Sequence, residues 1–89
     1  MLYLVISTPH FSKLEDVKSA RPEFRSWIDD LKAKKKVIST YHKMGKGSVV
    51  IFDVSSNEEL HSVLTQWLNI VPVPVSFEIH PLVTPSKGE

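Results

Sequence analysis

The stretch VVIFDVSSNEEL, residues 49–60, followed by His61, decides the fold of this chain. It begins with an apolar, β-rich run that is typical of a buried strand. Ser56 and Glu59 then stand in the Ser-x-x-Glu order of a capping box, which marks the start of a helix. Apolar residues follow at helical spacing, at Leu60, Val63, Leu64, Trp67 and Leu68. The stretch therefore predicts a strand that runs directly into an amphipathic helix.

The sequence on either side of this stretch predicts the remaining elements. A first helix begins at a second capping box, Ser12 to Glu15, and carries an apolar stripe as far as about residue 34. Pro22 interrupts this helix and either kinks it or makes it restart, with Ser19 as the new cap. A glycine-bearing hairpin connection joins the second and third strands. We expect strands over residues 2–6, 37–41, 48–54 and 75–80 and helices over residues 12–34 and from 56 onward.

The order β-α-β-β-α-β predicts an α+β fold of the ferredoxin-like type, a four-stranded antiparallel sheet with two helices on one face. Strands that are solvated on one face alternate between apolar and polar residues, but the first and third strands here are apolar throughout. Both faces of the sheet therefore need cover, and a second copy packed face to face gives a dimeric α+β barrel. We expect one domain over residues 1–83 and a flexible tail over residues 84–89.

Composition excludes several classes of function. The chain has 89 residues, no cysteine, and a net charge of +1 from eleven basic and ten acidic residues. This balance argues against nucleic acid or a membrane surface as a partner. A small chain without disulfides commonly gains stability by oligomerisation. No apolar run is long enough for a membrane span, and the start at Met1 resembles no signal peptide, so we expect a cytoplasmic protein.

The clearest candidate site lies on the first helix. Arg21 falls on the apolar stripe, where a charged side chain needs a carboxylate or an anionic ligand. One interpretation places Arg21 and Glu23 at the mouth of a cavity, with Arg21 as a carboxylate clamp and Glu23 as a proton carrier. The alternative is that Pro22 resets the helical phase, so that Ala20 faces the core and Arg21 points to water.

Other candidates lie on the strands and on the helix surfaces. Glu78 and His80 share one face of the last strand, which is either solvated or a polar lining of a dimer interior. Tyr41 and His42 point to opposite faces of the second strand. Trp27 stands at helical spacing, which is more typical of a core than of a ligand platform. No catalytic motif occurs and the histidines lack metal-ligand spacing, so we expect no metal and no cofactor.

The runs FDV-x-SN-x-ELH-xx-L, residues 52–64, and FEIHPL, residues 77–82, resemble the muconolactone delta-isomerase family. The similarity covers residues 1–83 and is weakest through the first helix, where Pro22 departs from the family pattern. The hairpin around Gly45 and Gly47 also lacks the aromatic and histidine residues of the family. Because the matching runs are mainly a core strand, a cap and a core helix, they point to the fold more firmly than to the activity.

The resemblance implies a cofactor-free isomerase of aromatic hydrocarbon catabolism, a homodimer that assembles into a larger ring of dimers. Such enzymes move a proton to shift a double bond in a small carboxylated lactone, and the family's site residues fall near Arg21 and Glu23. Two alternatives stay open. One is a non-catalytic small-molecule-binding or pathway-accessory domain. The other is a related cofactor-free monooxygenase or cyclase, with Tyr41, His80 and Trp27 near an aromatic substrate.

Overall fold

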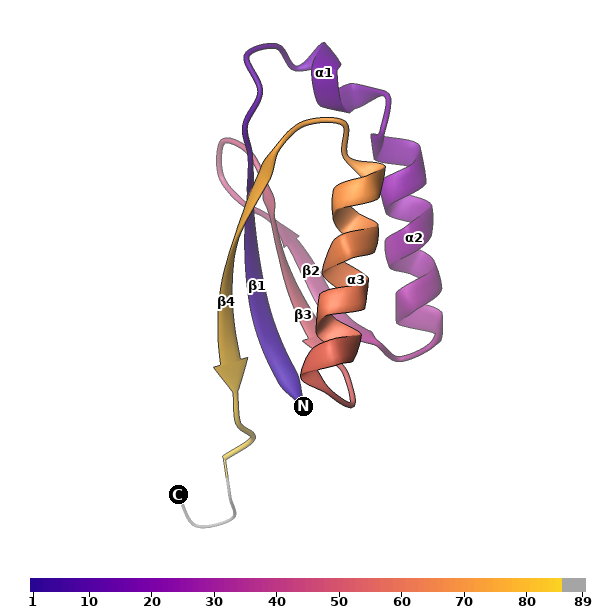
Figure 1. Ribbon diagram of the computed structural model, residues 1–89, viewed down its shortest axis with the longest axis vertical. Coiled ribbons are helices and arrows are strands. Elements are labelled where there is room, and N and C mark those ends of the chain that lie inside the picture. The colour runs from indigo at the N-terminus through magenta and orange to yellow at the C-terminus, as the bar shows by residue number, and fades with distance from the viewer. Residues whose placement is uncertain (86–89) are drawn as a thin grey trace.

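The computed structural model describes residues 1–85 and shows an antiparallel sheet covered by helices on one face (Figure 1). The strands lie in the order β2-β3-β1-β4, and neighbouring strands are antiparallel. This is the predicted ferredoxin-like arrangement. The elements in chain order are β1 (Leu2–Pro9), α1 (Glu15–Lys18), α2 (Arg21–Ala33), β2 (Val37–His42), β3 (Ser48–Asp53), α3 (Asn57–Ile70) and β4 (Val75–Leu82).

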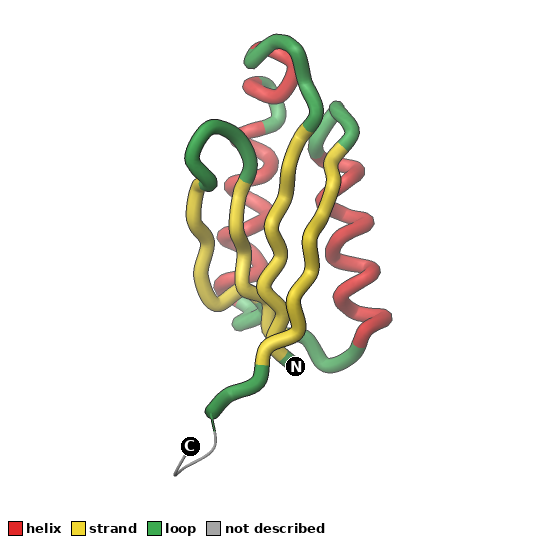
Figure 2. The backbone as a smooth tube through the Cα atoms, turned by 90° about the vertical axis from the view of Figure 1, so that its left-hand side faces the viewer, coloured by secondary structure: helices red, strands yellow, loops and turns green. Residues whose placement is uncertain are grey.

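The alternation of side chains in the central strands separates two apolar surfaces. Tyr3 and Val5 of β1 and Val50 and Phe52 of β3 point toward the helices and are buried. Their neighbours in sequence point to the other side of the sheet, which no helix covers (Figure 2). We call this side the open face and define it by Leu2, Leu4, Ile6, Val49 and Ile51. As expected for strands that are apolar throughout, both surfaces of β1 and β3 are hydrophobic.

Aromatic side chains fill the space between the helices and the sheet. Trp67 of α3 is 2% exposed and stands at the centre of this cluster. Its ring centroid lies 5.1 Å from Phe24, 5.1 Å from Phe77 and 6.3 Å from Phe52. These contacts join α2, α3, β3 and β4, so one side chain connects most of the elements of the core.

The first helical region differs from its prediction. The chain forms a single turn, α1, and then restarts as α2, so the predicted restart near Pro22 is correct. The predicted caps are wrong, because Leu14 and Ala20 occupy the N-cap positions and neither makes a side-chain capping bond. Pro22 fits in the first turn of α2, where its missing N–H costs nothing.

The start of α3 agrees with its sequence signature. Ser56 is the N-cap, and its Oγ accepts a hydrogen bond of 3.1 Å from the backbone N–H of Glu59. The Glu59 carboxylate does not complete the capping box with a hydrogen bond to Ser56. It accepts hydrogen bonds from Lys36 and Ser55 instead. The predicted apolar face of this helix is buried except at Leu68, which is 45% exposed.

Each of the two edge strands carries one irregularity. β2 carries a register shift between Val37 and Ser39 where it pairs with β3. β4 continues through Pro81 to Leu82, beyond the end that the sequence predicted, because a proline is tolerated in an edge strand. Of the expected tail, residues 86–89 lie outside the described part of the chain. Across residues 1–85, no helix is both long and apolar enough to cross a membrane.

Candidate functional site

A groove of about 620 Å³ lies on the helix side of the sheet, between α2 and the β2–β3 hairpin. Its volume is within the range of pockets that hold small molecules, about 300–1,000 Å³. Apolar side chains from the helices line one wall, among them Phe24, Ile28 and Trp67. Val50 and Thr40 of the sheet line the opposite wall. The groove can therefore enclose an apolar body of small-molecule size.

One end of the groove is polar. Ser7 of β1 is 3% exposed, and its Oγ accepts a hydrogen bond of 2.9 Å from the backbone N–H of Ser48. The same hydroxyl donates to the Ser48 carbonyl oxygen at 3.1 Å. His42 pairs with Ser48 across the sheet and so lies on the same face and in the same row. Thr40 precedes His42 by two residues and shares this face.

The hairpin reaches the groove because of one glycine. Gly47 has a φ of +104°, and a Cβ atom at this position would lie 2.1 Å from the carbonyl oxygen of Ser7. Only a residue without a side chain allows this close approach. A hydrogen bond of 3.0 Å from the Lys43 N–H to the Gly47 carbonyl closes the turn. Gly47 thus fixes the position of the neighbouring lysines relative to β1.

Basic side chains dominate both rims of the groove. Arg21, Arg25 and Lys32 line it from α2, and Lys43 and Lys46 line it from the hairpin. The Lys43 ammonium donates a hydrogen bond of 2.6 Å to the Thr8 hydroxyl. The Lys46 ammonium lies 5.1 Å from the centre of the Phe11 ring. Asp29 is the acidic residue in the lining. The arrangement favours an anionic ligand with an apolar body.

The structure separates the two residues that the sequence placed together on the first helix. Arg21 lines the groove, whereas Glu23 is exposed and is not among the lining residues. Residues two apart on an α-helix point in nearly opposite directions, because each residue turns the helix by about 100°. Arg21 therefore has Arg25, one turn further along, as its neighbour on this rim, and the sequence analysis missed Arg25.

Trp27 belongs to the interface between the helices. Its ring lies 5.6 Å from Phe24 and 5.9 Å from Trp67, and its Nε1–H donates to Gln66 Oε1 at 2.9 Å. It is not among the residues that line the groove. Trp67, which sequence reasoning treated as core, is both buried and part of the lining.

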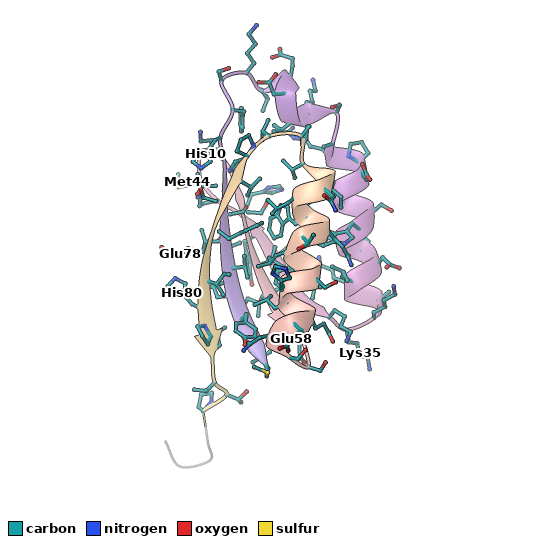
Figure 3. The ribbon with its side chains drawn as sticks, viewed as in Figure 1. His10, Lys35, Met44, Glu58, Glu78 and His80 are labelled. Atoms are coloured by element: carbon teal, nitrogen blue, oxygen red, sulfur yellow. The ribbon has the colours of Figure 1, made fainter. Side chains whose placement is uncertain are left out.

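His80 lies on the other side of the sheet from the groove. It pairs with Leu4 in register, so its side chain shares the open face, and its Nε2 is 2.8 Å from Glu78 Oε2. Figure 3 shows both side chains pointing away from the helices. Tyr41 is 61% exposed and also borders the groove. The predicted site residues thus divide between the groove and the open face.

Besides Arg25, sequence reasoning missed two residues of the hairpin. Lys43 and Lys46 stand among glycines in a turn, a context that usually means solvated lysines. The sequence feature that could have pointed to these lysines is the pair of glycines, which permits a tight turn packed against another strand. Among the described residues 1–85, no group of His, Asp and Glu is arranged to hold a metal ion.

Comparisons with known proteins agree with the fold. Residues 1–88 match a family described as Domain of unknown function (DUF3303). No curated protein matches the sequence. The crystal structure of MtbAldR is similar, with a TM-score of 0.60 and 19% identity over 99% of this chain. This chain spans 55% of the MtbAldR chain.

A structural-genomics protein from Agrobacterium tumefaciens is a more distant match. It has a TM-score of 0.42 and 14% identity, covering 99% of this chain and 96% of that protein. At these identities the similarities concern the fold alone. Neither the family match nor these structures identify a muconolactone delta-isomerase, so that resemblance stays a prediction.

Proposed function

The chain belongs to the DUF3303 family, and we propose that it is a cofactor-independent isomerase that acts on a small carboxylated, enolisable compound in the groove. The observation that carries the proposal is the composition of the groove, apolar along its walls, basic on its rims and lined by one histidine. The resemblance to muconolactone delta-isomerases supplies the reaction type. It also supplies the proposed setting, which is the breakdown of aromatic compounds.

Substrate capture is assigned to the arginines of α2. Arg21 and Arg25 are one helical turn apart, so their guanidinium groups can approach the same ligand. A guanidinium donates two parallel hydrogen bonds to a carboxylate, which fixes the orientation of the ligand as well as its charge. The carboxylate side chain of a lactone would then sit at the rim, with its ring against Phe24 and Ile28.

Proton transfer is assigned to His42 rather than to Glu23. His42 lines the groove, whereas the Glu23 carboxylate is directed away from it. A neutral imidazole near neutral pH can take a proton from one carbon and return it to another. Thr40, on the same face of β2, offers a hydroxyl donor to the developing enolate oxygen. No metal or cofactor is required for such a proton shift.

A second copy of the chain is the proposed partner, packed against the open face. Leu4, Ile6, Val49 and Ile51 form a continuous apolar surface across β1 and β3. In a face-to-face dimer this surface would leave water, at a gain of about 25 cal/mol per Å² of apolar area. Glu78 and His80 would then form part of a polar lining between the sheets. Assembly of dimers into a ring is implied by the resemblance only.

A second candidate function is ligand binding without catalysis. The observation that favours it is the position of Glu23, because the carboxylate implied by the resemblance does not reach the groove. A domain that kept the arginine rim but not the family's base would still bind a small organic acid. The two candidates predict the same ligand class and differ in turnover.

Proton exchange separates these candidates. Purified protein and muconolactone in deuterated buffer are followed by NMR, and deuterium incorporation or double-bond migration reports turnover. We expect His42→Gln to lower the exchange rate by at least about a hundredfold, the usual range for loss of a general base. Glu23→Gln should leave the rate unchanged. His61→Gln on the exposed surface of α3 is the matched control.

The outcomes lead to different conclusions. Loss of exchange in Glu23→Gln with full activity in His42→Gln would restore the assignment made from the sequence. Binding of muconolactone without exchange would favour the non-catalytic candidate. If light scattering shows a folded oligomer that neither binds nor exchanges the lactone, the proposed function is wrong for this substrate.

A further inference from the structure

We infer that the natural ligand of the groove is an organic dianion, with two carboxylate groups joined by an apolar segment. This inference rests on the proposed function, because it concerns the ligand of the same groove. It goes further by stating the number of charges and the apolar segment that joins them. The evidence is the distribution of charge along the two rims, where Asp29 is the single carboxylate among the described residues that line the groove.

Charge is segregated within a nearly neutral chain. The sequence has eleven basic and ten acidic residues. Among the residues that line the groove, however, a single carboxylate, Asp29, stands against a larger set of cations. This set consists of Arg21, Arg25, Lys32, Lys43 and Lys46. The groove is therefore strongly positive although the chain as a whole is not, which concentrates anions at this position.

The cations of the groove are not used in ion pairs within the described residues 1–85. The salt bridges of this part of the chain involve other groups, such as Lys34 with Asp30 and Lys36 with Glu59. Lys43 is held by the Thr8 hydroxyl, and Lys46 lies over the ring of Phe11. Both contacts are to neutral partners, so they position the ammonium groups without cancelling their charge.

The cations that line the groove form two groups, which come from two different elements. Arg21, Arg25 and Lys32 lie on α2, and Lys43 and Lys46 lie on the hairpin. Phe24, Ile28, Val50 and Trp67 give the same groove an apolar strip. A monocarboxylate would neutralise one group and leave the other facing the apolar body of the ligand. A dicarboxylate matches both groups at once and places its apolar segment along the strip.

The test uses the intact protein and isothermal titration calorimetry. Linear dicarboxylates from succinate to sebacate are compared with their monomethyl esters, which keep the length but remove one charge. We expect the best dicarboxylate to bind about two- to fivefold more tightly than its ester, the size of a favourable ion pair at a partly exposed rim. Its affinity should also fall more steeply with salt.

Two double variants locate the second charge. Lys43→Gln/Lys46→Gln should remove the advantage of the dicarboxylate over its monomethyl ester. The matched control is Lys34→Gln/Lys35→Asn, which removes two charges at the opposite end of the molecule, as the positions of Lys35 and Met44 in Figure 3 show. Asn suits position 35 because its φ is +61°. The control should keep the advantage.

Each outcome bears on a different statement. If dicarboxylate and ester bind equally, the inference is wrong and the proposed monocarboxylate site survives. If neither binds, the proposed function of the groove fails, and the inference fails with it. An advantage that persists in Lys43→Gln/Lys46→Gln would overturn the role of the hairpin. If that variant does not fold, the salt dependence of dicarboxylate and ester binding to the unmodified protein tests the second charge independently. Tighter binding of an analogue with a terminal phosphate would overturn the dicarboxylate assignment.

Discussion

Replacing Gly47 with alanine tests the close contact between the hairpin and β1. Gly45 provides a matched control, because both glycines lie in the same connection and have positive φ angles, +91° and +104°. Alanine at either position must adopt an unfavourable backbone conformation, at a cost of about 1–3 kcal/mol. Around Gly45 nothing lies within 4 Å of a Cβ atom, so Gly45→Ala should cost no more than this.

Gly47→Ala carries an additional cost. The new Cβ would lie 2.1 Å from the carbonyl oxygen of Ser7, so either the hairpin or β1 has to move. Forcing extra atoms into a packed region typically costs about 1–3 kcal/mol more. The free energy of unfolding of Gly47→Ala should therefore fall by about 2–6 kcal/mol in total, from a stability of about 5–15 kcal/mol.

Urea unfolding followed by circular dichroism measures both variants. The difference between them isolates the contact with Ser7, since the backbone cost is common to both. A difference of 1 kcal/mol corresponds to about 4–8 °C in Tm for a domain of this size. Equal destabilisation of the two variants, within the error of the titration, would refute the close approach of the hairpin to β1.

Four further expectations follow from the described contacts. Trp67→Ala should cost about 3–5 kcal/mol because the side chain is 2% exposed, and a loss below 1 kcal/mol on urea unfolding would contradict its central position. Ser56→Ala should cost about 1 kcal/mol by loss of the N-cap bond, whereas an unchanged urea midpoint would show that the cap contributes nothing. Hydrogen bonds from Lys36 and Ser55 lower the pKa of Glu59 below its ordinary value of 4.5. A carboxyl group with a depressed pKa stabilises the fold above its unfolded-state pKa, and this contribution is lost as the pH falls. Glu59→Gln should therefore lower the urea midpoint at neutral pH and have the same midpoint as the parent protein in acid. A difference between the two midpoints that does not change with pH would argue against the pairing of Glu59 with Lys36. Ile51→Lys on the open face should abolish the proposed dimer in light scattering, and an unchanged mass would exclude this face as the interface.

Local sequence patterns predicted the fold because each pattern specified one element. The run from Val49 to Leu60 contains a strand, a cap and a helix start, and all three occur in the structure. The first helix was less predictable. Ser12 and Ser19 fit the sequence rule for caps, but Leu14 and Ala20 occupy the cap positions, since the chain restarts within a single turn ahead of Pro22.

The site was less predictable than the fold because it depends on contacts between distant segments. Arg21 was singled out because a charge on an apolar stripe is unusual, and it is among the residues that line the groove. Glu23 was paired with Arg21 because the two residues are close in sequence. On an α-helix, however, residues two apart point in nearly opposite directions. Lys43 and Lys46 became part of the groove only through the approach of Gly47 to β1. The two glycines permit a tight turn there, but they do not specify which strand the turn approaches.

The irregularities in the edge strands restrict how copies of this chain can meet. An uninterrupted edge exposes a row of free N–H and C=O groups on which another chain can add a strand. Pro81 removes one of these donors from β4, and the irregular register at Val37 and Ser39 bends the pairing edge of β2. Continuous growth of the sheet from copy to copy, the route to fibres, is therefore disfavoured at both edges. Association through the open face, the proposed dimer interface, would instead close after two copies.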